Sequence, residues 1–251
     1  MIKITRTLIL SILSLTAVQA QGIPAGNSTP NPPHAPASTI PSDGNYKAHF
    51  ENSKKCMENI AAMKGKPCDI IFIGDSITQL WGGGMWNGAP RGKEVWARYY
   101  ANRNALNFGV GWDRTQDVLW RLDHMEVKDF RPKVAVILIG TNNHADPPGE
   151  IAAGIRAVII KTKQTFPGVK VILVSLLPRQ DFYDTIVKTN AMIRRFADNK
   201  SVYYLDLFPR FLRDGDNWNG LGSDHLHPTE VGYEIWATAM NPLLNQLLEG
   251  N

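Results

Sequence analysis

Residues 134–139 read Val134-Ala-Val-Ile-Leu-Ile139, six apolar residues in a row without a charged or polar break. Such a run is typical of a strand that is buried on both faces, as in a parallel sheet covered by helices. Similar runs occur on both sides of it in the chain. The predicted strands are residues 69–74, 105–108, 133–140, 169–175 and 202–206.

Amphipathic stretches alternate with these strands, and they predict helices over residues 46–64, 93–100, 114–124, 150–166, 184–198 and 228–248. Strand–helix alternation produces right-handed βαβ units and a parallel sheet with helices on both faces. We therefore predict an α/β fold, a three-layer α/β/α sandwich with a five-stranded parallel sheet. Ligands bind such sheets beyond the carboxyl ends of the strands, so functional residues are expected there.

Composition and charge narrow the functional classes. The chain has 251 residues, 43% of them hydrophobic and 20% charged, which suits a globular protein of one or at most two domains. Two cysteines are too few for a disulfide scaffold or a four-cysteine zinc site. Of the 27 Lys and Arg residues, two lie in residues 1–20, so 25 face the 23 Asp and Glu residues beyond that point. This near-neutral balance does not indicate a nucleic-acid partner.

The N-terminal region predicts export. Lys3 and Arg6 precede an apolar run over residues 8–18, and Val18-Gln-Ala20 supplies the small residues of a cleavage site. This pattern predicts a secretory signal peptide over residues 1–20, because a membrane span needs ~20 apolar residues. Residues 21–45 contain six prolines and predict a flexible linker, followed by a folded domain over 46–251. We expect a secreted or periplasmic protein, cleaved near Ala20 and without a membrane span.

Polar residues follow the first three predicted strands. Ser76 stands in Gly74-Asp-Ser76, where a helix N-terminus would favour an anion forming on the atom that the serine attacks. Gly109 and Asn142 follow the next two strands and could donate hydrogen bonds to the same anion. Each residue alone has a simpler reading, since serine caps helices and glycine and asparagine occur in ordinary turns.

A further pair lies just before the last predicted helix. Asp224 and His227 are three residues apart, so the carboxylate can orient the imidazole while its other nitrogen acts as a base. Two alternatives remain open at this point. Asp224, His225 and His227 could bind a metal, although further ligands cannot be located, or the segment could simply cap the last helix.

Together these blocks resemble the SGNH hydrolases, also called the GDSL-like lipase/esterase superfamily, and they resemble it in order and spacing. Within that superfamily, Asn107-Phe-Gly-Val-Gly111 and Gly140-Thr-Asn-Asn143 look like the catalytic subunits of the platelet-activating-factor acetylhydrolase group. The resemblance implies a flavodoxin-like fold. Two departures are a tryptophan, Trp112, where that group has glycine, and a Gly/Trp-rich loop over residues 82–88.

The resemblance implies a role for each block residue. Ser76 would be the nucleophile, His227 the general base and Asp224 the group that orients His227. The oxyanion hole would consist of the backbone N–H groups of Ser76 and Gly109 and the side-chain amide of Asn142. No cofactor and no metal are required for this chemistry.

The predicted function is a secreted serine esterase that removes short acyl groups, most simply acetyl, from carbohydrate. Trp81, Trp86 and Trp112 are the tentative substrate-binding residues, because flat indole faces suit sugar rings. The alternatives are a lysophospholipase, lipase or thioesterase with the same site, and a carbohydrate-binding or adhesion module without turnover. The predicted partner is a small-molecule or glycan ester, and the oligomeric state stays open.

The two cysteines predict a further feature. Cys56 and Cys68 both precede the first strand, and an exported protein matures in an oxidising compartment. We therefore predict a disulfide between them, with two separate buried thiols as the alternative.

Overall fold

The sheet of this protein is fully parallel, as the apolar strands predict. The computed structural model describes residues 35–82, 91–127, 129–212 and 218–250, all within the unit Ala35–Asn251. Its five strands are arranged in the order β2-β1-β3-β4-β5. Each predicted strand is present to within two residues, namely β1 (Ile70–Gly74), β2 (Ala105–Gly109), β3 (Val134–Leu138), β4 (Lys170–Val174) and β5 (Val202–Leu205).

The helices are α1 (Gly44–Ala48), α2 (Phe50–Ala61), α3 (Ser76–Gln79), α4 (Lys93–Tyr99), α5 (Thr115–His124), α6 (Pro148–Thr165), α7 (Tyr183–Ile193), α8 (Phe208–Phe211) and α9 (Glu230–Glu249). The helix predicted over 46–64 is divided at His49, whose backbone leaves the helical region. The helix predicted over 184–198 ends at Ile193 and continues as a 3-10 turn. The sequence pattern missed α3 and α8, because four residues are too short to show a helical period.

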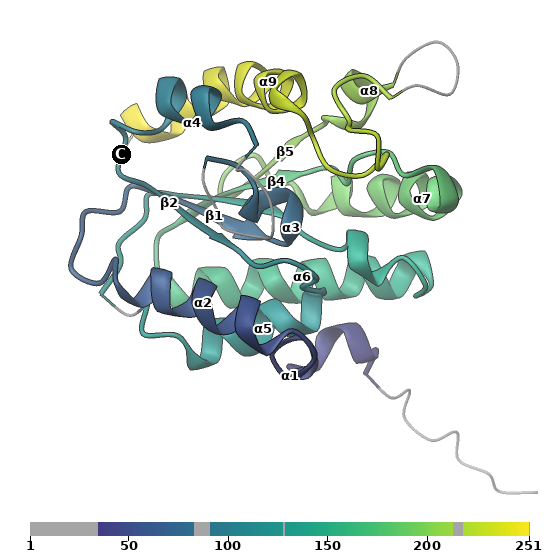
Figure 1. Ribbon diagram of the computed structural model, residues 1–251, viewed down its shortest axis with the longest axis horizontal. Helices are drawn as coiled ribbons and strands as arrows, with labels where there is room; N and C mark the ends of the chain where they lie inside the picture. The colour runs from purple at the N-terminus through teal and green to yellow at the C-terminus, as the bar shows by residue number, and fades with distance from the viewer. Residues whose placement is uncertain (1–34, 83–90, 128, 213–217, 251) are drawn as a thin grey trace, which may run out of the picture. The chain divides into compact units, whose positions relative to one another are not determined.

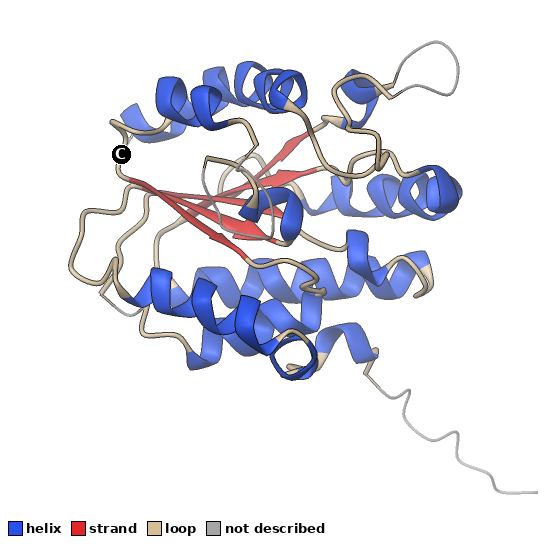
Figure 2. Ribbon diagram, viewed as in Figure 1, coloured by secondary structure: helices blue, strands red, loops and turns tan. Residues whose placement is uncertain are grey.

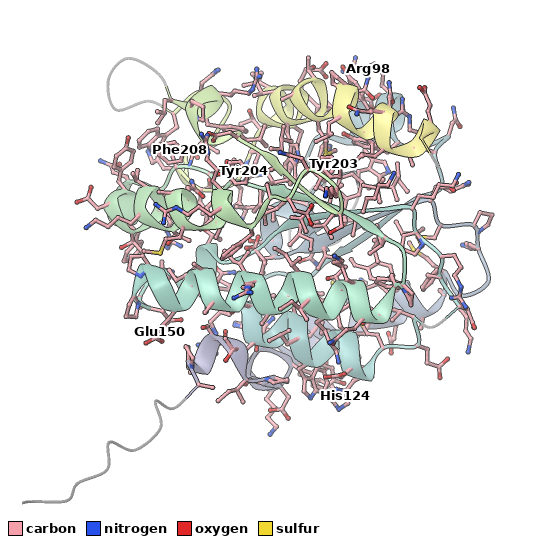
Figure 3. All side chains as sticks on the ribbon, turned by 180° about the vertical axis from the view of Figure 1, so that it is seen from behind. Arg98, His124, Glu150, Tyr203, Tyr204 and Phe208 are labelled. Carbon is pink, nitrogen blue, oxygen red and sulfur yellow. The ribbon has the colours of Figure 1, made fainter. Side chains whose placement is uncertain are left out.

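Two helical layers enclose the sheet (Figures 1 and 2). Helices α2, α5, α6 and α7 pack on one face, and α4, α8 and α9 pack on the other. Figure 3 shows Arg98 on the α4–α9 layer, with His124 and Glu150 on the opposite layer. The central strand β3 is buried along its whole length, since both faces are covered. The three-layer α/β/α prediction is confirmed.

The packed region begins earlier than predicted. Residues 35–45 belong to the predicted linker, yet Ser38 and Asn45 are buried. The Ser38 hydroxyl donates to the Glu150 carbonyl at 2.7 Å, and the Thr115 hydroxyl donates to the Ser38 carbonyl at 2.8 Å. These polar contacts attach the segment to α5 and α6, and a proline count does not reveal them. The linker prediction is therefore wrong for residues 35–45.

A buried ion pair lies between β2 and α5. The Arg121 Nε donates to Asp113 Oδ2 at 2.6 Å, and a second guanidinium nitrogen donates to the Phe108 carbonyl at 3.1 Å. Asn45 completes the group by donating to Asp113 Oδ1 at 2.5 Å. Burial raises the pKa of Asp113 to about 6, while Arg121 acts in the opposite direction. The carboxylate thus depends on its partners to remain ionised.

Replacing Arg121 should therefore destabilise the fold. We expect Arg121→Met to lower the free energy of unfolding by about 3 kcal/mol at pH 8, because it leaves a buried carboxylate without its cation. The loss should be smaller at pH 5, since a protonated Asp113 needs no counter-charge and stability falls as pH rises through a raised carboxyl pKa. Urea denaturation at both pH values measures it.

The matched control is Arg98→Met, which removes an exposed ion pair with Glu234 on the other helical layer. Exposed pairs contribute 0–1 kcal/mol, so this variant should unfold close to the wild type at both pH values. Equal stability losses in the two variants would contradict the role assigned to Arg121.

Candidate active site

The predicted nucleophile lies at the carboxyl end of β1. Gly74 ends the strand, and a Cβ there would lie 2.1 Å from Thr78 Oγ1 and 2.4 Å from the Leu138 carbonyl oxygen, so only glycine fits. Asp75 caps α3 by accepting a hydrogen bond from the Ile77 N–H at 2.9 Å. Ser76 is thereby placed at the first helical position, buried but for 4% of its surface.

A chain of hydrogen bonds joins Ser76, His227 and Asp224. The Ser76 Oγ and the His227 Nε2 are 2.8 Å apart, and the His227 Nδ1 lies 3.0 Å from Asp224 Oδ2. A carboxylate accepts only, so Nδ1 carries the proton and Nε2 is the acceptor for the serine hydroxyl. The structure brings together the three residues that the sequence assigned to catalysis.

The Asp224 side chain holds the loop that carries it and His227. Asp224 Oδ1 accepts from the N–H groups of Leu226 and His227, at 3.1 and 3.0 Å. His225 has a left-handed backbone with φ of 51°, which closes the turn between them. Both ring nitrogens of His227 face Ser76 and Asp224, so neither points to a metal shared with His225. In the described part of the chain, no three His, Cys, Asp or Glu side chains are grouped as a metal site requires.

The electrostatics of the site favour a neutral imidazole. Burial lowers the pKa of His227, and the guanidinium groups of Arg91 and Arg179 act in the same direction against Asp224. Burial would raise the pKa of Asp224, but hydrogen bonds from the His227 backbone and ring and from Leu226 lower it to about 2. Asp224 is therefore ionised, and the imidazole of His227 beside it is less readily protonated than an ordinary histidine.

A second carboxyl group lies beneath the serine. Asp75 is fully buried, and burial raises its pKa to about 7. Its second oxygen has no hydrogen-bond partner among the described residues. The raised pKa means that this carboxyl carries less negative charge at neutral pH than an ordinary aspartate would.

The structure changes the predicted oxyanion hole. The Gly109 N–H donates to Asn107 Oδ1 at 2.9 Å, so this donor is already engaged and the structure does not support its predicted place in the oxyanion hole. A Cβ at Gly109 would lie 2.2 Å from the Gln79 nitrogen, so this glycine serves the close packing of β2 on α3. Asn142 donates to the Asp113 carbonyl at 3.0 Å, and its amide carries a second hydrogen that can reach a ligand.

Sequence reasoning missed Asn107, which holds α3 in place. Its amide nitrogen donates to the carbonyls of Thr78 and Trp81, at 2.7 and 2.9 Å, and so caps the end of the short helix that begins with Ser76. A polar residue inside the otherwise apolar strand β2 was the available signal. Gln79 was also missed, and its Oε1 accepts from the Gly111 N–H at 2.6 Å.

The three tryptophans proposed for substrate binding differ in where the structure places them. Trp81 is 1% exposed and packs against Phe72, Tyr233 and Trp236, so it belongs to the core and the prediction for it is wrong. Trp86 lies outside the described residues. Trp112 is 49% exposed, and its ring is stacked on His49 with centroids 5.3 Å apart.

Trp112 also adopts a left-handed backbone, with φ of 69°. This conformation disfavours residues with a side chain, which explains why a related group has glycine at the position. The next residue, Asp113, is the one whose carbonyl binds Asn142. Trp112 therefore belongs to the loop that orients one predicted oxyanion donor.

The cysteines are separate thiols. Both are buried and free, which contradicts the predicted disulfide. Gln79 Nε2 donates to the Cys56 sulfur at 2.9 Å, whereas Cys68 donates to the Ile70 carbonyl at 3.6 Å. Burial raises the pKa of Cys56 to about 11 and that of Cys68 to about 12, which keeps both thiols protonated and unreactive.

Comparison with known proteins places this geometry in a family. Residues 72–235 match the model of the GDSL-like lipase/acylhydrolase family. The alpha1 subunit of platelet-activating factor acetylhydrolase IB from Bos taurus is 30% identical over 230 residues, covering 89% of this chain and 93% of that protein. None of the helices within the described ranges is long and apolar enough to cross a membrane.

Solved structures share the fold. A GDSL-like lipase from Bacteroides thetaiotaomicron superposes with a TM-score of 0.61 at 20% identity, covering 78% of this chain and 98% of that one. A carbohydrate esterase of family 3 from Talaromyces cellulolyticus gives a TM-score of 0.56 at 18% identity, with coverages of 73% and 99%. The family match and the acetylhydrolase relatives lead to one conclusion: the chain belongs to the GDSL-like lipase/acylhydrolase family and is an ester hydrolase.

Proposed function

We propose that this protein is an exported serine esterase that removes acetyl or other short acyl groups through Ser76, His227 and Asp224. The observation that carries the catalytic part is the hydrogen-bond chain from Ser76 Oγ through the His227 ring to Asp224. A nucleophile, a base within hydrogen-bond reach and a third group that orients the base form the pattern of acyl transfer.

The reaction proceeds in two steps. As the Ser76 oxygen attacks the ester carbonyl, its proton passes to His227 Nε2, and Asp224 stabilises the resulting imidazolium. The Ser76 N–H and the free hydrogen of the Asn142 amide are the proposed donors to the oxyanion. The alcohol leaves with the proton from His227, and water then repeats the sequence on the acyl-enzyme.

The proposal of a short acyl group rests on the relatives. They are named as acetylhydrolases, so we propose acetyl as the acyl group that this protein removes. The alcohol is less constrained. We propose a sugar hydroxyl, because Trp112 directly precedes Asp113, whose carbonyl binds Asn142, and has an exposed side chain, and apolar sugar faces pack on aromatic rings.

A phospholipid is the second candidate alcohol. The relatives' name refers to platelet-activating factor, and 30% identity over most of both chains supports a related substrate here. Export would favour the sugar ester over the phospholipid. Export itself is an expectation from the sequence of residues 1–20, which lie outside the described structure. The structural likeness to a carbohydrate esterase concerns the fold alone and does not favour either alcohol.

Removing the nucleophile should abolish hydrolysis without unfolding the protein. We expect Ser76→Ala and His227→Ala each to reduce kcat for 4-nitrophenyl acetate by more than ~10³-fold, because nucleophile and base act as a unit. Asp224→Asn should lose less, since the backbone still holds the loop. The matched control is Ser223→Ala, which replaces the exposed serine that precedes Asp224 in the chain and should retain full activity. Substantial turnover by Ser76→Ala would disprove the mechanism.

The pH dependence follows from the state of His227. Only the neutral imidazole can accept the serine proton, and its pKa is lowered by burial and by two arginines. We expect kcat/KM of the wild type to rise along an acid limb whose midpoint lies below ~6.5, the usual histidine value. Initial rates with 4-nitrophenyl acetate between pH 4 and 9, each corrected for spontaneous hydrolysis, measure it. A midpoint above that value would contradict the electrostatic analysis.

Substrate preference tests the acyl group and the alcohol separately. We expect acetyl esters to be hydrolysed faster than octanoyl esters, and Trp112→Ala to raise KM for acetylated xylo-oligosaccharides about tenfold. The KM of this variant for 4-nitrophenyl acetate should stay within about twofold of the wild type, since that ester has no sugar ring to pack on the Trp112 indole. Acetate release confined to phospholipid, or a preference for octanoate, would refute the sugar-ester proposal and leave the serine mechanism intact.

A further inference from the structure

Arg91 lies next to the active site but belongs to none of the motifs that led to it. Its backbone is held beside the end of α3, because the Arg91 N–H donates to the Leu80 carbonyl at 2.9 Å. The Arg91 carbonyl in turn accepts from the Gly82 N–H at 3.1 Å. The side chain therefore starts from a fixed point on the α3 side of the site.

The guanidinium of Arg91 reaches across to the loop that carries the base. One terminal nitrogen donates to the His227 carbonyl at 3.2 Å, and the other donates to Asp224 Oδ2 at 3.3 Å. A Cβ on Gly222 would lie 3.1 Å from the first of these nitrogens. The guanidinium thus lies directly against the turn that contains Asp224 and His227.

The carboxylate of Asp224 is shared between the imidazole of His227 and the guanidinium of Arg91. Its Oδ2 accepts from His227 Nδ1 at 3.0 Å and also from Arg91, while Oδ1 accepts two backbone N–H groups. A carboxylate that already neutralises a guanidinium stabilises an adjacent imidazolium less well. The positive charge of Arg91 also repels a proton on His227 directly.

Charged and titratable groups face His227 from each neighbouring element. Asp224, on the same loop, favours the charged imidazole. Arg179, which follows β4 and donates to the Thr141 carbonyl at 3.1 Å, opposes it. From the α3 side come the neutral Ser76 hydroxyl and Asp75, whose charge at neutral pH is reduced because burial raises its pKa. The Tyr233 hydroxyl on α9 donates to the Ile77 carbonyl and stays neutral.

We propose that Arg91 is a positioning residue that anchors the Asp224–His227 turn and keeps the imidazole neutral, so that the esterase retains its base in acidic surroundings. The inference rests on the proposed role of His227 as general base. It concerns a residue supplied by the segment between α3 and α4, outside the sequence blocks that carry the family resemblance. Arg91 does not touch the reacting atoms, and it acts through Asp224 and His227.

The first test compares Arg91→Met with Arg91→Lys. In Arg91→Met the acid limb of kcat/KM should move to higher pH, so that at a pH on that limb kcat/KM falls about threefold further, relative to the plateau, than in the wild type. Arg91→Lys keeps the charge and should keep the wild-type limb, even if its plateau falls. Arg103→Met, which removes a distant arginine bonded to Asn245, is the matched control and should not move the limb.

Salt provides a test on the unmodified protein. The Arg91 side chain is 36% exposed, so added salt screens its charge. Salt also screens Asp224, so the informative quantity is the difference between the two proteins: raising NaCl from 0.05 to 1 M should move the wild-type limb to higher pH relative to the Arg91→Met limb. A lower plateau with an unmoved limb in Arg91→Met would show a purely structural role and overturn the proposal.

A final readout separates this inference from the proposed function. His227 can be titrated by NMR in Ser76→Ala, with and without Arg91→Met, where no turnover is needed. The His227 resonance should titrate at higher pH when Arg91 is absent. If the wild type lacks esterase activity but this titration moves, the proposed function fails and the coupling stands. If activity is present and the titration does not move, the Arg91 proposal alone is wrong.

Discussion

Gly74 pairs with Gly109 on one side and with Leu138 on the other, and this parallel register aligns the ends of the three central strands. Neither glycine tolerates a Cβ, because α3 packs directly on the ends of β1 and β2. The close approach places Ser76 above the sheet edge and leaves the loops after β2 and β3 beside it. All further features of the site depend on this contact between a four-residue helix and two strand ends.

A buried ion pair holds the loop after β2 in place. Asp113 and Arg121 are both buried, and Asn45 donates both to Asp113 and to the Gly111 carbonyl at 3.0 Å. Burying an ion pair rarely adds stability over well-packed apolar residues. In this fold the pair fixes the backbone whose Asp113 carbonyl orients Asn142. Its value is therefore best understood as positioning, with stability depending on the pair being kept intact.

The acid–base behaviour of the site follows from how few negative charges face His227. Asp224 is ionised but shared with Arg91, and burial of Asp75 raises its pKa and so reduces its charge at neutral pH. Arg91 and Arg179 both lower the pKa of His227. The structure thus combines a carboxylate that orients the imidazole with cations that keep the ring in the unprotonated form from which a general base acts.

Local sequence determined the parallel sheet and its strands to within two residues, and it marked Ser76, Asp224 and His227 as candidates for one site. Continuous apolar runs and residues at strand ends are properties of short segments, which a sequence displays directly. Tertiary packing alone decided that the Gly109 N–H serves Asn107, that Trp81 lies in the core, and that Cys56 contacts Gln79 instead of Cys68. It also decided that Arg91 reaches Asp224, 133 residues away in the chain. Each of these outcomes depends on which distant side chain occupies the neighbouring space, and no local pattern records that.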